Sequence, residues 1–167
     1  HPMDESWQPA IERLVPAADA VISTTSFLQN KFGGSIVHYG IDGEYFKPQP
    51  VADTFALKAS LGLSGRKIIV FGGVVRAHKG VELILEALEI LNNPAAALLI
   101  AGPNTDHVGV LSGTTAGRRF LRCTGSLPRD QMPRYLDLAD MIVLPLKDNL
   151  LARSQMPCKV FEALAMA

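Results

Sequence analysis

Short apolar runs alternate along this chain with longer stretches in which apolar residues recur every three or four positions. The short runs are rich in aliphatic and β-branched side chains and end at Gly or Pro, as buried strands do. They predict strands at residues 20–25, 35–39, 67–73, 95–102, 118–125 and 141–146. The longer stretches between them predict helices.

The clearest helical pattern covers residues 79–91, where aliphatic side chains from Val81 to Leu91 share one face. Glu82 and two further glutamates fall on the opposite face, which we expect to meet water. Residues 128–140 repeat the pattern, and Pro157 suits the first turn of a final helix. Strand followed by helix, repeated, predicts an α/β fold with a doubly wound, Rossmann-like parallel sheet.

A polar break with two prolines at residues 42–55 divides the chain. We expect residues 1–45 to close one domain and provide the linker. Residues 46–167 are then an incomplete second domain that holds most of the sheet.

Charge and composition exclude several functional classes. The 16 basic residues balance the 16 acidic ones without clustering, which argues against a nucleic-acid partner. No apolar run reaches the roughly 18 residues of a transmembrane segment, and the polar first ten residues carry no positive leader. These features predict a cytoplasmic protein.

The potential metal ligands show no spacing that suits a metal ion. His38, His78 and His107 are scattered, so we expect no metal site and no prosthetic group. Cys123 and Cys158 lie in apolar segments and are predicted to be buried thiols.

The candidate chemistry lies where the strands end, because doubly wound sheets bind ligands beyond the carboxyl ends of their strands. Gly72 and Gly73 end one strand, and Lys79 opens the next helix with Arg76 nearby. Glycines allow close backbone approach, and a helix start with two cations could hold a diphosphate. A plain strand-to-helix turn with a solvated Lys79 explains the same residues equally well.

A second candidate is Glu162, one turn into the final helix. Its carboxylate could accept two hydrogen bonds from a ribose diol. From these residues alone, a solvent-exposed helical glutamate is the simpler interpretation.

Five segments, taken in order, resemble a known family. They are "ADAVISTTSFLQNKFGGSIVHYGIDGEYFKP", "IIVFGGVVRAHKGVELILEAL", "LLIAG", "LRCTGSLPRDQMPRYLDLADMIVLP" and "MPCKVFEALAMA". Over nearly all of residues 17–167 the chain is similar to group-1, family-4 retaining glycosyltransferases. The resemblance implies the GT-B fold, in which two Rossmann-like domains face each other across a cleft and the second holds most of the sugar nucleotide. This chain would be a truncated half of such an enzyme.

The resemblance also implies roles for particular residues. Lys79 would contact the donor diphosphate and Glu162 the ribose hydroxyls. The backbone around Ser126 and Leu127 would meet the nucleobase. The loop at residues 154–160, which contains Ser154 and Lys159, would border the donor sugar and its phosphates. The implied reaction moves a sugar, of hexosyl type, from a nucleotide-diphosphate donor to an unknown acceptor with retention.

The chain departs from the family pattern at two positions. Val74 stands where the family often has Arg, and Arg76 is a candidate substitute. Ser154 stands where the first of two paired glutamates is expected, as in a variant "S…P-x-K-x-x-E" motif of some bacterial members. The usual contact to the donor sugar is therefore in question.

The resemblance further implies that this chain is a fragment, inactive alone, of a parent able to lie at the inner face of the membrane. The strand at residues 141–146 would then be an open edge, and we expect dimerisation or aggregation through it. Two other interpretations stay open, a non-catalytic nucleotide-binding module and a GT-B sugar-nucleotide epimerase. A flavodoxin-like regulatory domain would need a phosphorylatable Asp at a strand end, and no predicted strand ends in one.

Overall fold

The computed structural model describes residues 8–166 and divides them into two compact units. Unit 1 combines residues 8–40 with Arg153–Met156. Unit 2 combines Ile41–Ala152 with residues 157–166. The helix α8 (Leu150–Ser154) spans the division between them.

Unit 1 contains short elements only. In chain order they are α1 (Gln8–Glu12), a 3₁₀ turn (Val15–Ala17), β1 (Ile22–Ser23), α2 (Ser26–Phe32) and β2 (Ser35–Ile36). The two strands pair in parallel, with Ile22 opposite Ser35. The strands predicted at 20–25 and 35–39 are therefore present but only two residues long.

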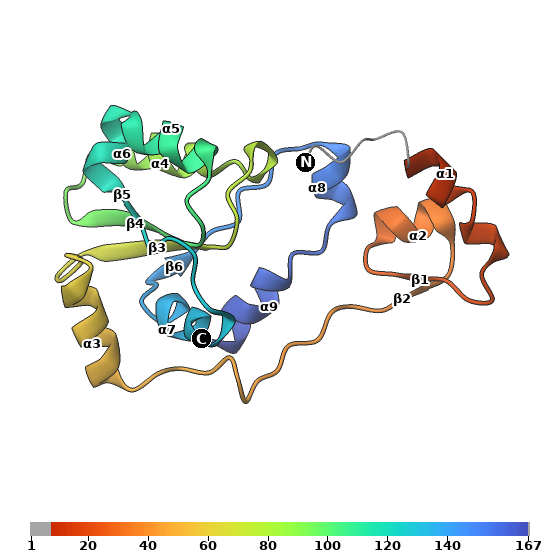
Figure 1. The fold of residues 1–167 in the computed structure, drawn as a ribbon, viewed down its shortest axis with the longest axis horizontal. Coiled ribbons are helices and arrows are strands. Elements are labelled where there is room, and N and C mark those ends of the chain that lie inside the picture. Colours follow the sequence, from red (N-terminus) through yellow and green to blue (C-terminus); the bar gives the residue numbers. More distant parts are fainter. Residues whose placement is uncertain (1–7, 167) are drawn as a thin grey trace. The chain divides into compact units, whose positions relative to one another are not determined.

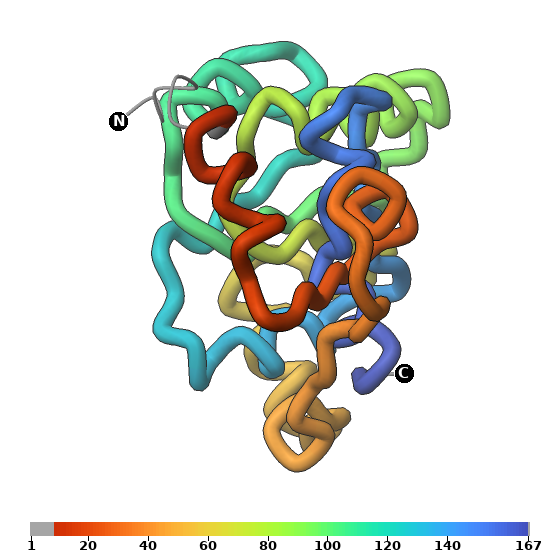
Figure 2. The backbone as a smooth tube through the Cα atoms, turned by 90° about the vertical axis from the view of Figure 1, so that its right-hand side faces the viewer, coloured from red at the N-terminus to blue at the C-terminus, as the bar shows by residue number. Residues whose placement is uncertain are grey.

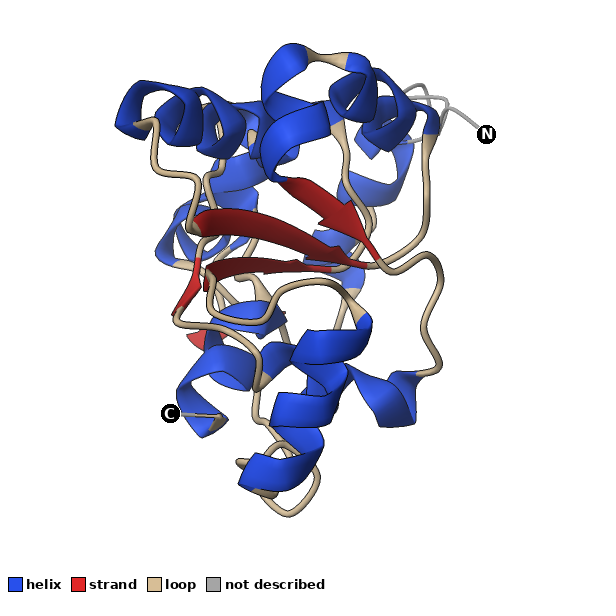
Figure 3. Cartoon of the chain, turned by 90° about the vertical axis from the view of Figure 1, so that its left-hand side faces the viewer, coloured by secondary structure: helices blue, strands red, loops and turns tan. Residues whose placement is uncertain are grey.

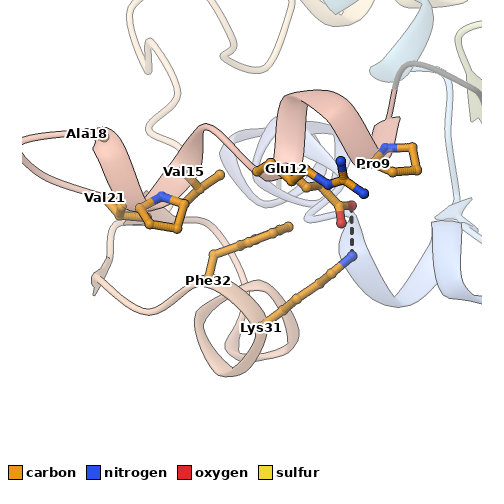
Figure 4. A pocket seen from close by; sticks show the side chains of 9 residues that line it. Pro9, Glu12, Val15, Ala18, Val21, Lys31 and Phe32 are labelled. Carbon is orange, nitrogen blue, oxygen red and sulfur yellow. Dashed lines mark hydrogen bonds and ion pairs between the residues drawn. The ribbon is translucent and has the colours of Figure 1, made fainter.

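Unit 1 has little apolar burial of its own. Its large side chains are mostly exposed, among them Ile11, Leu14, Ile22 and Tyr39. Within residues 9–40, the buried side chain is a polar one, that of Ser23. An open pocket lies inside this unit, and Figure 4 shows the ion pair at one end of it, in which Lys31 Nζ is 2.7 Å from Glu12 Oε1.

Unit 2 is a parallel sheet with helices on both faces (Figure 3). The strands, in the spatial order β5-β4-β3-β6, are β5 (Leu121–Cys123), β4 (Ala96–Ala101), β3 (Lys67–Gly72) and β6 (Met141–Ile142). Its helices and turns are α3 (Val51–Ser60), η3 (Ala77–Lys79), α4 (Val81–Leu91), α5 (Asp106–Gly113), α6 (Thr115–Phe120), η4 (Arg129–Gln131), α7 (Met132–Leu136) and α9 (Cys158–Ala165). This architecture confirms the predicted α/β class and its doubly wound parallel sheet.

The sheet separates two apolar cores. Helices α4, α5 and α6 lie on one face and α3, α7 and α9 on the other (Figure 1). Along β3, Ile68 and Val70 face the α7 side while Phe71 faces α4, and alternate residues of β4 divide in the same way. Because successive strand side chains point to opposite faces, a continuous apolar run fills both cores.

The predicted strand at 118–125 is wrong for its first residues. Thr115–Phe120 forms α6, and strand β5 begins only at Leu121. Thr114 caps this helix, since its Oγ1 accepts a hydrogen bond from Gly117 N at 2.9 Å. The cap and the burial of Phe120 favour a helix here, although the composition of the segment is typical of a strand.

The predicted strand at 141–146 is shorter than expected. Only Met141 and Ile142 pair with β3, and Leu146 N already donates to Leu144 O at 2.9 Å in a turn. The strand is an edge of the sheet, as predicted. Dimerisation through it stays a prediction.

The expected burial of four side chains in unit 2 is corrected. Cys158 is exposed rather than buried, and Cys123 is only half-buried. Leu91, expected on the buried face of α4, is exposed, whereas Glu82 is largely shielded from water. The polar break around residues 42–55 contains the start of α3 at Val51.

None of the helices within residues 8–166 combines the length and the apolar character that a membrane span requires.

Candidate functional site

The loops that follow β3, β4 and β5 are held together at the carboxyl edge of the sheet. Gly73 N donates to Ala101 O at 2.8 Å, and a Cβ on Gly102 would lie 2.3 Å from Gly73 O. Gly102 N in turn donates to Thr124 Oγ1 at 3.2 Å. The strand ends at "FGG", "IAG" and "CTG" are therefore in direct contact, through backbone atoms and the Thr124 hydroxyl.

Lys159 reaches this edge from α9. Gly73 has a φ of +112°, and a Cβ built on it would lie 2.5 Å from Lys159 Cε and 3.1 Å from Lys159 Nζ. The backbone conformation therefore requires glycine here, and the end of the lysine side chain would have to shift to accommodate a Cβ. The Lys159 side chain thus lies beside the carboxyl end of β3.

Glu162 lies next to this lysine. The two residues are three apart on α9, and Lys159 Nζ is 3.9 Å from Glu162 Oε2. The Glu162 side chain is only 15% exposed, and its Oε2 is buried without a hydrogen bond from any described residue. A buried carboxylate oxygen in that state is costly, so this one is suited to accept hydrogen bonds from a ligand. The interpretation of Glu162 as a solvent-exposed helical residue is wrong.

Arg76 and Lys79 complete a cluster of positive charge with Lys159. Burial lowers the pKa of Lys79 below its ordinary value, and the charges of Lys159 and Arg76 lower it further. Lys79 therefore lies within electrostatic range of both other cations. A diphosphate placed there would relieve the repulsion.

The turn that carries Lys79 differs from the predicted helix start. Ala77–Lys79 forms a 3₁₀ turn, and Gly80, with a φ of +64°, precedes the first residue of α4. A Cβ on Gly80 would lie 2.1 Å from Pro145 O in the loop after β6. Gly80 is thus needed for close approach of two loops at this edge.

Other predicted residues lie apart from this cluster. Gly72 faces the core, because a Cβ there would lie 3.3 Å from Leu136 Cδ2. Ser126 is exposed in the connection between β5 and α7, which Figure 2 traces, and Leu127 packs against the core on the α7 side. Ser154 ends α8 in unit 1, so its place beside the other residues stays a prediction.

The sequence pattern did not identify two residues that contribute to this edge. Thr124 links the loops after β4 and β5 through its hydroxyl, and Lys147 N donates to His78 O at 3.1 Å. A polar residue directly after a strand is the signal that could have identified Thr124. Lys147 carries no such signal, since its contact depends on the path of a loop.

Within residues 8–166, no group of three His, Cys, Asp or Glu side chains is placed to hold a metal ion.

Comparison with known families and proteins gives a consistent result. A family model described as "Glycosyl transferases group 1" matches residues 65–167. The putative teichuronic acid biosynthesis glycosyltransferase TuaC of Bacillus subtilis (strain 168) is 28% identical over 165 residues, which covers 94% of this chain and 39% of that protein. The alpha-D-kanosaminyltransferase of Streptomyces kanamyceticus is 32% identical over 102 residues, covering 56% of this chain and 26% of the relative. This chain thus spans well under half the length of either relative.

Among solved structures, Anabaena Alr3699/HepE in complex with UDP-glucose superposes with a TM-score of 0.76. The sequences are 18% identical, and the match covers 98% of this chain and 47% of that one. The likeness shows a shared fold.

Proposed function

We propose, from the premise that this chain belongs to the glycosyl transferases of group 1, that unit 2 binds the nucleoside-diphosphate end of a nucleotide-sugar donor. The observation that carries the proposal is the convergence of three cations beside a buried carboxylate at the carboxyl edge of the sheet. Lys159 lies over Gly73, and Lys79 is close enough to Lys159 and Arg76 for their charges to lower its pKa. Doubly wound sheets bind ligands at this edge.

Each residue then has a chemical role. Arg76, Lys79 and Lys159 neutralise the diphosphate, and Glu162 accepts hydrogen bonds from the ribose hydroxyls through its buried oxygen. The backbone at Ser126 and Leu127 meets the nucleobase.

The cationic cluster also suits the chemical step. When the bond between the sugar and the diphosphate breaks, negative charge grows on the leaving diphosphate, and fixed positive charges nearby stabilise it. We propose family-4 chemistry, which retains the configuration at the anomeric carbon. Lys159, which lies beside Gly73, places one of these charges at the carboxyl end of β3.

The donor site is only part of a transferase. We propose that residues 1–45 close the first domain and link it to the donor domain at residues 46–167. Relatives are more than twice as long as this chain, and unit 1 exposes many large hydrophobic side chains. The chain alone is therefore proposed to bind a donor without transferring its sugar to an acceptor.

A calorimetric titration of the chain with UDP, GDP and ADP tests the proposal. UDP comes first because the structural neighbour from Anabaena is a complex with UDP-glucose. We expect saturable binding of one nucleotide, weakened about tenfold or more by Glu162→Gln and by Lys79→Met.

Two matched variants control for general effects. Glu89→Gln removes an exposed carboxylate from another helix, α4. Lys58→Met removes a cation whose charge acts on Asp140, at the amino end of β3. Both are expected to bind as the unaltered chain does. If the two control variants lose as much nucleotide affinity as Glu162→Gln and Lys79→Met, a donor site in this chain is contradicted. The absence of binding of any nucleotide would contradict it as well.

The two other interpretations receive no support from the relatives, which are named as glycosyltransferases.

A further inference from the structure

The loop after β6 contacts the turn that carries Arg76 and Lys79, and the start of α4 behind it, at three points. Lys147 N donates to His78 O at 3.1 Å, and Gly80 packs without a side chain against Pro145 O. The third point is an ion pair, in which Lys147 Nζ is 2.5 Å from Glu82 Oε1. Residues 76–80 are thus attached to the loop after β6 by backbone contacts, and the first turn of α4, which follows them directly, is attached to the same loop by one charged pair.

We infer that Glu82 and Lys147 form a positioning pair that holds residues 76–80 in the conformation that binds a diphosphate. The inference rests on the proposed function, because it assigns the pair to the same donor site. Neither residue needs to touch the ligand. Their effect passes through His78 and Gly80, which flank Lys79 in the sequence.

The electrostatics of Glu82 suit this role. Burial alone would raise its pKa, but hydrogen bonds from Lys147 and the backbone, with the charges of Lys147 and His107, outweigh burial and lower the pKa. The carboxylate is therefore ionised at neutral pH. It also lies in the first turn of α4, where the helix dipole favours a negative charge.

His107 occupies the other side of the carboxylate. Its Nε2 is 3.7 Å from Glu82 Oε2, and neither atom has a hydrogen-bond partner among the described residues. The two oxygens of Glu82 are thus placed differently. Oε1 forms the ion pair with Lys147 Nζ, whereas Oε2 faces the His107 imidazole on α5 at more than hydrogen-bond distance.

The pair is not needed to hold α4 in the fold. Val81, Ile84, Leu85 and Leu88 are all buried and attach the helix to the sheet. Removal of the pair should therefore release the loops while leaving the core intact. This separates a positioning role from a purely structural one.

The experiment compares Glu82→Gln, Lys147→Met and the double variant with the unaltered chain. UDP affinity is measured by calorimetry, and exchange of the Lys147 amide, which donates to His78 O, by NMR. We expect each single variant to bind UDP about three- to tenfold more weakly and to exchange this amide faster, with a similar melting temperature. The double variant should be no weaker than either single one, and Lys147→Arg should restore affinity.

Glu86→Gln, one turn further along α4 and exposed, serves as the matched control and should change neither readout. Unchanged affinity and exchange in Glu82→Gln would overturn the inference, and so would additive losses in the double variant. A large fall in melting temperature with normal UDP affinity would also overturn it, because the pair would then be structural only. If the unaltered chain binds no nucleotide, the proposed function fails, and the exchange rates still report whether the pair holds the loops.

Discussion

Lys159 lies against the backbone of Gly73, so closely that a Cβ on Gly73 would stand 2.5 Å from Lys159 Cε. Two parts of the chain more than eighty positions apart in the sequence thus share one small volume. The glycine is required by its φ of +112°, and a side chain there would also displace the end of the lysine. The lysine lies where the proposed diphosphate would bind.

Gly73→Ala should therefore damage both folding and binding. The alanine would adopt a strained φ and displace Lys159, at a cost of about 1–3 kcal/mol in the free energy of unfolding. UDP affinity should fall because one cation moves away. Urea denaturation and calorimetry measure the two effects.

Gly109→Ala is the control for this substitution. Gly109 lies within α5, and a Cβ there would meet no atom within 4 Å. An alanine at that position should stabilise the chain by roughly 0.5–1 kcal/mol through helix propensity and leave UDP affinity unchanged. If Gly73→Ala behaves like Gly109→Ala, the close packing of Lys159 is wrong.

Binding of a diphosphate should be linked to proton uptake by Lys79. Burial and the neighbouring cations hold its pKa below 10.5 in the free chain. A bound diphosphate offsets the repulsion and raises that pKa, so protons are taken up when the pH lies between the two values. In alkaline solution below pH 10.5, the apparent binding enthalpy should therefore differ between buffers of different ionisation enthalpy.

Lys79→Arg separates this proton uptake from binding itself. A guanidinium stays protonated throughout this pH range, so the variant should keep much of its affinity and lose the dependence on buffer. Buffer dependence that persists in Lys79→Arg would assign the proton to another group.

The central strands were predictable because their environment is simple. β3 and β4 are buried on both faces, so their sequences are continuous apolar runs closed by glycine. The runs at 67–73 and 95–102 differ from the observed strands by only one or two residues at their ends. The positions of Gly73 and Lys79 at the carboxyl edge follow from that topology.

The edge strands of the sheet were harder to predict, because their composition does not determine where the pairing between strands ends. "RRFLRC" has apolar residues compatible with strand or helix, and the Thr114 cap decides for α6. Met141–Ile142 is followed by two apolar residues, Val143 and Leu144, that do not extend the strand, and Pro145 then approaches Gly80. The contact between Lys159 and Gly73 could not be predicted, since it depends on how α9 packs against the sheet.

Loss of the Thr114 cap should destabilise unit 2. Thr114 Oγ1 accepts from Gly117 N and donates to Leu111 O at 2.7 Å, so it joins the end of α5 to the start of α6. Thr114→Ala is expected to lower the free energy of unfolding by about 1–2 kcal/mol, the usual cost of a lost N-cap. Thr115→Ala, an exposed neighbour in α6, should cost a few tenths of a kcal/mol or less. Equal effects in urea denaturation would argue against α6 as the structure has it.

Acid should weaken the fold through Asp140, which ties β6 to β3. Its Oδ2 accepts from Ile68 N at 2.8 Å, and its Oδ1 accepts from Lys67 Nζ at 2.7 Å. Burial opposes ionisation of Asp140, but these hydrogen bonds and the nearby lysine charges outweigh it and hold the pKa below 3.8. A carboxyl with a lowered folded pKa stabilises the fold above its unfolded pKa, and that stability is lost as the pH falls through the folded value.

Asp140→Asn should therefore lower the free energy of unfolding at pH 7 by about 1–2 kcal/mol, mainly because a neutral amide oxygen accepts the bond from Ile68 N more weakly than a carboxylate does. The ion pair with Lys67 adds little, because the Lys67 side chain is 79% exposed. The difference from the unaltered chain should shrink steadily as the pH falls below about 4, where the carboxyl begins to protonate. Urea denaturation at several pH values measures this, with Asp130→Asn, at an exposed position in the turn before α7, as the control. A difference that stays constant down to pH 3 would mean that the charge of Asp140 contributes nothing and that only the shape of its side chain matters.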